Sequence, residues 1–232
     1  LDDEARNQCL QYLREDVRAE FLEAMDTAQL VAAAENLDTD DFADILQQLP
    51  ATITNQVLEN LDARDRARVE SVLSYPEDSA GGLMNTDTIT VRPRHAIELV
   101  LRYLRLRKDL PKSTDSLIVV NSADEYVGML PLAKLLTSDP TVTVREIMAG
   151  DVPAIHVSET DAAVAKMFSE RDLISAPVID DNGLLVGRIT IDDVVDVIIE
   201  DAEEAVLAQA GLDVDEDTFA PVHKAVRRRA VW

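Results

Sequence analysis

The sequence of 232 residues is poor in the residues on which several common kinds of functional site depend. Its single cysteine, Cys9, excludes an internal disulfide framework and fits a reducing, cytosolic setting. The histidines, His95, His156 and His223, are far apart in sequence and outside the spacings of zinc sites and catalytic triads. No hydrophobic run approaches the roughly 20 residues that span a bilayer. The sequence therefore predicts neither an enzyme nor a membrane-spanning segment.

Basic residues are also scarce. The 22 Lys and Arg residues stand against 45 Asp and Glu residues, which gives a net charge of −23. This balance argues against nucleic acid as a partner, because binding to phosphates requires positive charge. Cations or basic protein surfaces are the partners that such a charge favours.

The acidic residues are concentrated near the end of the chain. Eleven carboxylates and no lysine or arginine lie between Asp192 and Asp217. The spacing of valine, isoleucine and leucine predicts a helix over residues 192–209. Four of its carboxylates fall at spacings of three and four and share one side: Asp193, Asp196, Glu200 and Glu204. Stacked like charges destabilise a helix unless a cation such as Mg²⁺ neutralises them, and a solvated acidic face is the alternative.

The first third of the chain has a twelve-residue repeat of large apolar side chains, each followed by a helix cap or breaker. The apolar positions are Met25, Leu37, Leu49, Leu61 and Leu73, and the caps or breakers are Asp26, Asp38, Pro50, Asp62 and Ser74. Twelve residues accommodate a short helix and a bend, so residues 1 to about 74 are predicted to be short helices stacked in a superhelix. Asp40 and Asp44 share one helix face, either as complements to the helix dipole or as an acidic patch for a cation.

Residues 83–139 and 145–200 repeat one another at a period of about sixty residues. Each copy contains a short strand, an amphipathic helix, two further strands joined by a turn, and a second helix. The lead-in segments also correspond, since residues 83–85 align with residues 147–149. The sequence therefore predicts an α+β multidomain protein with an all-α superhelical N domain, a tandem βαββα pair and a C-terminal helix.

The duplicated unit resembles a tandem pair of CBS domains, the cystathionine β-synthase type. Residues Gly187 to Asp193 (GRITIDD) match the ending of nucleotide-binding members, in which Thr190 would face phosphates and Asp193 the ribose. The equivalent segment Gly128 to Lys134 (GMLPLAK) has proline and lysine where the hydroxyl and the carboxylate are expected. The resemblance thus implies at most one complete site for an adenine nucleotide such as ATP.

The segment between the helical array and the CBS pair, Tyr75 to Met84 (YPEDSAGGLM), resembles the linker of the MgtE family of magnesium transporters and channels. The resemblance implies a helical N domain at 1–78, CBS domains at 79–140 and 141–200, and an acidic plug helix at 201–232. That helix would lead to the protein's own transmembrane pore domain, which is absent from this chain. The resemblance also implies a cytoplasmic homodimer that belongs, in the full-length protein, to the cell (inner) membrane.

The resemblance implies roles for two further features of the sequence. Arg227 to Arg229 and Trp232 become a membrane-proximal segment, although arginines that complement a helix dipole produce the same pattern. An apolar helix face is expected at the dimer interface, with packing inside the CBS pair as the alternative. Its residues are Ala162, Ala163, Val164 and Met167.

The family's metal ligands carry over only where this sequence keeps an acid. In the N domain, the pattern DDFAD at residues 40–44 implies Asp40 and Asp44. In the CBS pair and the plug helix, the matching acids are Asp172, Asp193, Asp196, Asp201 and Glu204. Ala205 and Thr160 replace acids of the family pattern, which weakens or removes one or two sites.

The resemblance and the acidic faces together predict a Mg²⁺-sensing regulatory region rather than an enzyme. Mg²⁺ would bridge the acidic faces of the N domain, the CBS pair and the plug helix, and would thereby close the pore. The alternative is an adenine-nucleotide-sensing CBS module whose acidic tail is solvated. The two functions are compatible, because Asp193 can serve either ligand.

Overall fold

The computed structural model describes residues 21–22, 24–34, 37–107 and 109–209. In its last helix, the side chains of residues 200, 203, 204 and 207–209 are outside the description. The features noted at Cys9, Arg227 to Arg229 and Trp232 also lie outside the described residues. Within the described ranges, no helix is both long enough and apolar enough to cross a membrane.

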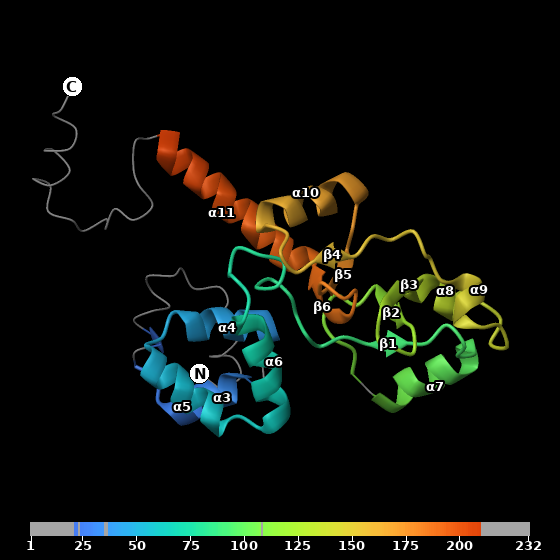
Figure 1. The fold of residues 1–232 in the computed structure, drawn as a ribbon, viewed down its shortest axis with the longest axis horizontal. Helices are drawn as coiled ribbons and strands as arrows, with labels where there is room; N and C mark the ends of the chain where they lie inside the picture. The colour runs from blue at the N-terminus through green and yellow to red at the C-terminus, as the bar shows by residue number, and fades with distance from the viewer. Residues whose placement is uncertain (1–20, 23, 35–36, 108, 210–232) are drawn as a thin grey trace, which may run out of the picture.

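The helical domain is built from short helices that follow the twelve-residue repeat (Figure 1). They are α3 (Thr27–Ala34), α4 (Thr39–Gln47), α5 (Ala51–Asn60) and α6 (Ala63–Leu73). Each begins directly after one of the expected caps or breakers. At Asp62, for example, the carboxylate accepts hydrogen bonds from the backbone N–H groups of Arg64 and Asp65. The predicted array of short helices is confirmed.

The two copies of the βαββα unit have the same topology. The first module consists of β1 (Thr90–Val91), α7 (Ile97–Arg107), β2 (Ser116–Val120), β3 (Tyr126–Pro131) and α8 (Leu132–Thr137). After the short helix α9 (Val144–Ile147), the second module consists of β4 (Ile155–His156), α10 (Asp161–Arg171), β5 (Ser175–Ile179), β6 (Leu185–Thr190) and α11 (Ile191–Gln209). In each three-stranded sheet, the first strand is parallel to the second, and the second is antiparallel to the third. The predicted duplication and fold class are confirmed.

The segments that lead into the two modules cross to each other's sheet. Asn85 exchanges two backbone hydrogen bonds with Arg188 in β6, and Ala149 does the same with Met129 in β3. The second crossing requires Gly128, because a β-carbon there would lie 2.5 Å from the carbonyl oxygen of Ala149. This reciprocal exchange ties the two modules together.

The linker attaches the helical domain to the second module. The backbone N–H of Ala80 donates to the carbonyl of Glu159, just beyond β4. Ala43 of α4 and Val72 of α6 are fully buried in the hydrophobic cluster that forms the core of the second module. As a result, the first turn of α4 is near enough to the first turn of α11 for the charge of Asp193 to affect Asp40.

The helix face expected at a dimer interface is largely covered inside the second module. Val164 is buried in the core and Met167 packs against it, because α10 lies on α11. For Val164 the expectation of exposure is therefore wrong, and the alternative of packing within the pair holds. Large apolar side chains are exposed on α7, α8 and α11 instead. They are Leu99, Tyr103, Leu106, Leu136, Ile191, Val195, Ile198, Ile199 and Val206.

Candidate cation site

Two carboxylates from separate domains, one on α4 and one on α11, are near enough for the charge of one to raise the pKa of the other. Asp40 lies in the first turn of α4 and Asp193 in the first turn of α11. Asp40 is only 6% exposed, and its Oδ1 has no hydrogen-bond partner. Burial, and after it the negative charges of Asp193, Asp41 and Asp38, raise the pKa of Asp40 well above its usual value. Helix α4 thus presents a buried carboxyl oxygen that the protein leaves unpaired.

Asp193 is held in place by the residue that ends β6. The backbone N–H and the hydroxyl of Thr190 donate to Asp193 Oδ2 at 3.0 and 2.9 Å. Burial raises the pKa of Asp193 to about 7; the hydrogen bonds from Thr190 oppose the rise, and the charges of Asp192 and Asp41 add to it. The burial and the neighbouring acids thus favour the protonated or cation-bound form of this carboxyl.

This pair has the chemistry of a site for a hard divalent cation. Buried carboxylates that face each other destabilise the folded state unless a cation or a proton neutralises them. The unpaired oxygen of Asp40 is a hard ligand of the kind that Mg²⁺ prefers. Among the described residues, no three acidic, histidine or cysteine side chains are grouped to hold a metal. An ion here would use one or two carboxylates and keep several waters, as Mg²⁺ commonly does.

The other acids expected in the N domain and at the start of α11 lie one turn away from this pair. Asp44 is half-buried on α4, four residues after Asp40. Asp196 is exposed on α11, and partial desolvation together with the charge of Asp192 raises its pKa. These two acids extend the acidic surface along both helices.

The remaining expected ligands are farther along the chain. Asp172 is exposed and occupies the left-handed C-cap of α10, with φ 52°. Asp201 is exposed in the second half of α11. Glu204 belongs to the same helix, but its side chain lies outside the described residues. The structure therefore places Asp40 within reach of the charge of Asp193, and among the described side chains it does not group Asp172 or Asp201 with them as a metal cluster.

The two residues expected to bind a nucleotide are engaged with the start of α11. The Thr190 hydroxyl contacts Asp192 as well as Asp193, and the Ser113 hydroxyl reaches Asp192 Oδ2 at 3.4 Å. A phosphate placed at Thr190 would have to displace these carboxylates or receive a cation between itself and them. In the first module, Pro131 precedes α8 and makes no side-chain cap, so this module lacks the arrangement, as its sequence predicts.

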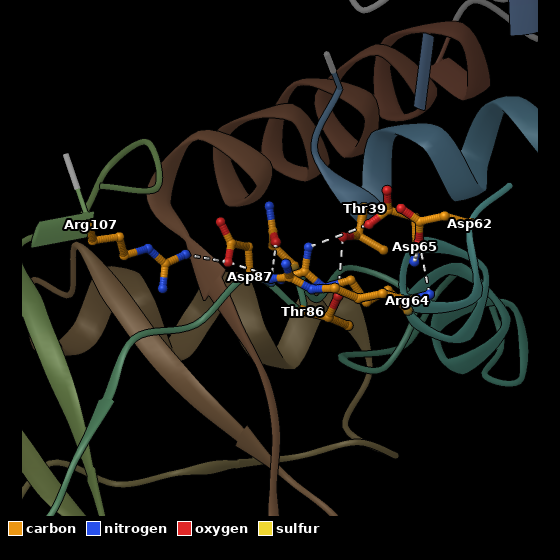
Figure 2. Close-up of polar contacts among 9 residues, drawn as sticks. Thr39, Asp62, Arg64, Asp65, Thr86, Asp87 and Arg107 are labelled. Carbon is orange, nitrogen blue, oxygen red and sulfur yellow. Dashed lines mark hydrogen bonds and ion pairs between the residues drawn. The ribbon is translucent and has the colours of Figure 1, made fainter. Parts of the chain in front are cut away.

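The sequence did not reveal a second set of polar contacts at the same interface, in which opposite charges meet. Asp87, just after the linker, accepts hydrogen bonds from Arg68 of α6 at 3.0 Å and from Arg107 of α7 at 2.9 Å (Figure 2). Lys112 lies 3.2 Å from Asp38, directly before α4. A cleft of about 320 Å³ opens beside these pairs, between α4, α6 and the loop after α7. No sequence signal marks them, because the partners are distant in the chain and have no fixed spacing.

Known sequences resemble this chain over most of its length. The model of the MgtE intracellular N domain matches residues 1–78, and that of the CBS domain matches residues 144–200. A magnesium transporter MgtE of Thermus thermophilus is 35% identical over 185 residues, which are 78% of this chain and 41% of the relative. One of Bacillus subtilis is 28% identical over 202 residues, 86% of this chain and 44% of the relative. The chain thus spans less than half the length of these curated relatives.

Solved structures show the same resemblance in three dimensions. The cytosolic domain of the Mg²⁺ channel MgtE in complex with ATP is 34% identical, with a TM-score of 0.79 over 85% of this chain and 81% of that one. The soluble part of a magnesium transporter, 22% identical, gives a TM-score of 0.79 over 87% of this chain and 80% of that one, which shows the shared fold. The helical domain, the linker and the tandem CBS modules described above are thus present in the same order in a relative more than 30% identical, and the chain belongs to the MgtE family.

Proposed function

We propose that this chain is the cytosolic regulatory region of a magnesium channel or transporter, and that it senses Mg²⁺ through carboxylates that meet between its domains. Family membership supports the general function. The observation that supports the mechanism most strongly is the Asp40–Asp193 pair: Asp40 has a buried carboxyl oxygen without a hydrogen-bond partner, and the charge of the half-buried Asp193 helps to raise its pKa. These residues are proposed ligands of one bridging ion.

The mechanism is electrostatic. Without Mg²⁺, two like charges at 4 Å repel by about 1 kcal/mol in water and by about 4 kcal/mol near a protein surface. This repulsion weakens the attachment of α4 to α11. When Mg²⁺ occupies the site, the repulsion is replaced by bridging, and the stabilisation grows as RT ln(1 + [L]/Kd). Helix α11 is then fixed relative to the helical domain, and in the full-length membrane protein this state would close the pore.

The other acids extend the same proposal. Asp44 and Asp196 are suited to further ions at the edge of the interface, because each lies one turn from the central pair. Asp172, Asp201 and Glu204 are proposed ligands that require the partner subunit or the pore domain, since Asp172 and Asp201 are exposed here.

A homodimer is proposed through the exposed apolar helix faces of the CBS modules. On α7, Leu99, Tyr103 and Leu106 recur at helical spacing and remain 45–75% exposed. Such a stripe on a globular domain indicates an interface. The domain boundaries at 78, 140 and 200 remain part of the proposal.

Adenine-nucleotide sensing is the second candidate function. It is favoured by the hydrogen bond between Thr190 and Asp193 and by the ATP in the structure of the 34% identical MgtE cytosolic domain. Because Asp193 would serve both ligands, binding of ATP at Thr190 would change the affinity of the cation site, and by linkage Mg²⁺ would change the affinity for ATP to the same extent.

Calorimetric titration of this chain with Mg²⁺, and separately with ATP, tests the two functions. We expect Mg²⁺ to bind to the wild type, and to bind more weakly after Asp40→Asn or Asp193→Asn. Glu59→Gln is the matched control, because Glu59 is an exposed acid on α5. No heat of Mg²⁺ binding at millimolar concentration would refute the sensor function, whereas heat with ATP alone would support the second candidate.

A further inference from the structure

The linker that follows the helical domain is bound to the second CBS module, although it leads into the first. Two consecutive N–H groups of the linker, at Ala80 and Gly81, donate to carbonyls of the segment that joins β4 to α10, at 2.8 and 3.0 Å. In return, the N–H of Asp161 donates to the carbonyl of Asp78 at 3.1 Å. Residues 78–81 thus run antiparallel to the residues before α10 (Figure 1).

The same segment is buried and continues onto the sheet of the second module. Ala80 and Met84 are fully buried and belong to the hydrophobic cluster that forms the core of that module. Farther along, Asn85 exchanges two backbone hydrogen bonds with Arg188 in β6. Residues 78–85 therefore precede the first CBS module in the chain but are part of the second in the fold.

An aromatic ring packed on a glycine fixes the beginning of the linker. A β-carbon at Gly81 would lie 2.3 Å from Cγ of Tyr75, so the Tyr75 side chain leaves room only for glycine there. Tyr75 also packs against the core of the second module. The next residue, Pro76, has a fixed φ, and its carbonyl accepts a hydrogen bond from the Ser79 hydroxyl at 2.6 Å. Tyr75 and Pro76 are therefore held by the second module as well.

The residue before Tyr75 belongs to the helical domain instead. Ser74 is the exposed C-cap of α6, and its hydroxyl donates to the carbonyl of Ser71 in the last turn of that helix, at 2.7 Å. The N–H of Tyr75 still donates to the carbonyl of Val72 at 3.0 Å. The chain thus passes from α6 to the second module within the backbone of Ser74 and Tyr75.

We infer that the linker stays attached to the second CBS module at all times, and that the helical domain pivots about the backbone of Ser74 and Tyr75 when it attaches to the CBS pair or leaves it. The motion itself rests on the proposed function, in which loss of Mg²⁺ weakens the attachment of α4 to α11. A short pivot keeps Asp40 near Asp193 after release, because the effective concentration of a tethered site falls as its tether lengthens. The length of the pivot therefore helps to set the Mg²⁺ concentration at which the helical domain attaches.

Hydrogen exchange of single amides, followed by NMR in the full chain, tests the attachment of the linker. The amides of Ala80 and Asp161 report on the two sides of the pairing, with Mg²⁺ and with EDTA. Ala43→Glu releases the helical domain by a second route, because it places a charge in the cluster on which α4 packs. We expect both amides to exchange within about threefold of their rates in Mg²⁺, since their partners remain in place. This holds even if Ala43→Glu unfolds the helical domain.

A pair of glycine variants tests what holds the linker. Gly81→Ala displaces the ring of Tyr75 and should speed exchange at Ala80 by about tenfold or more. Gly150→Ala is the matched control, because a β-carbon at Gly150 meets no atom within 4 Å. Adding Tyr75→Ala to Gly81→Ala removes the clash and should restore part of the protection, which a merely destabilising substitution would not do.

A longer pivot tests the effect on attachment. Dipolar spin-label spectroscopy follows the distance from α5 to α10, with labels at the exposed positions Glu59→Cys and Lys166→Cys in a Cys9→Ser background. Insertion of Gly-Ser after Ser74 should leave the linker amides protected. It should raise the Mg²⁺ concentration needed for half-maximal narrowing of the distance by about threefold or more.

Two results would overturn the pivot. One is loss of protection at Ala80 and Asp161 in Ala43→Glu, which would show that the linker leaves the second module with the helical domain. The other is an inserted Gly-Ser that leaves the Mg²⁺ dependence of the distance unchanged. If Mg²⁺ has no effect on the distance in the reference protein, the proposed sensor function fails, and exchange in Ala43→Glu still decides whether the linker stays attached.

Discussion

The interface between the helical domain and the CBS modules has two sides with opposite electrostatics. On one side, Asp87 meets Arg68 and Arg107 at hydrogen-bonding distance. On the other are Asp40 and Asp193, and the pKa of each carboxyl is raised by burial and by neighbouring acids. The first side contributes attraction to docking, and salt screens this contribution. The second opposes docking until a proton or a cation arrives.

This difference separates two tasks that a sensor must perform. The paired side determines where α4 lies, and the acidic side determines whether that position is favourable at a given cation concentration. Changes that neutralise one side should therefore leave a recognisable contribution from the other.

The largest effect is expected from removing a charge on the acidic side. Asp40→Asn should raise the free energy of unfolding in EDTA by about 1–3 kcal/mol, because a buried charge near Asp193 is removed. Urea unfolding measures this, with Glu59→Gln as the control for loss of an exposed acid on α5. Destabilisation by Asp40→Asn in EDTA would mean that the acid side does not oppose docking.

The next largest effect is expected in the pH dependence of stability, and it comes from the acidic side. The pKa of Asp40 and that of Asp193 are higher in the folded protein than in the unfolded chain, so the folded state binds more protons between their unfolded and folded values. Stability in EDTA should therefore increase as pH falls from about 8 to about 5, by more than about 1 kcal/mol, since one pKa unit corresponds to about 1.4 kcal/mol. The double variant Asp40→Asn, Asp193→Asn should flatten this slope.

Acids with lowered pKa produce the opposite slope only at more acidic pH. Hydrogen bonds from neighbouring groups lower the pKa of Asp62, Asp139 and Glu146. Their contributions are present above their unfolded pKa and are lost as pH falls through the lower folded value. Between pH 5 and 8, the acids with a raised pKa, Asp40, Asp193 and Asp196, therefore favour stability at lower pH. They are opposed there by His95, whose pKa is lowered by burial and by the charges of Arg94 and Arg92. Stability that rises with pH throughout that window would contradict the assignment.

The smallest effects are expected from substitutions of two aspartates that directly precede helices but make different contacts. Asp62 caps α6 with two hydrogen bonds, whereas Asp38 precedes α4 without capping it and contacts Lys112. Asp62→Ala should lower the stability of the helical domain in circular-dichroism melts at any ionic strength. Asp38→Ala should change mainly the distance between the helical domain and the second CBS module, and only at low salt. Dipolar spin-label spectroscopy measures this distance, with labels at Glu59→Cys on α5 and Lys166→Cys on α10 in a Cys9→Ser background. Equal effects of both changes on helix stability would show that Asp38 acts as an ordinary cap.

The elements of this fold follow from local patterns, and its interface does not. The twelve-residue repeat predicts the helices because a cap or breaker, such as Asp62 or Pro50, directly precedes each helical segment. The sixty-residue duplication likewise predicts both sheets, since short apolar strands and turns recur in order. These signals act within a few residues, so sequence alone was sufficient to recognise them.

The candidate site was predictable only in part. The acids of α4 and α11 stand out in the sequence as runs of like charge, and the family resemblance named Asp40 and Asp193. That these two, rather than Asp172 or Asp201, are brought together depends on how α4 packs on the second module. The partners of Asp87 are 19 and 20 residues away in the chain, and such spacings carry no periodic signal. Val164 was misjudged because an apolar helix face does not reveal which neighbour covers it.

Bridging of Asp40 and Asp193 by Mg²⁺ is the central claim, and thermal melts at matched ionic strength test it most directly. Wild type and the double variant Asp40→Asn, Asp193→Asn are compared in millimolar MgCl₂ and in NaCl of equal ionic strength. We expect Mg²⁺ to raise the wild-type melting temperature above its value in NaCl and to have little effect on the variant. At a hundredfold excess over Kd, the expected stabilisation of the wild type is about 3 kcal/mol. Equal wild-type melting temperatures in the two salts would contradict bridging and leave only charge screening.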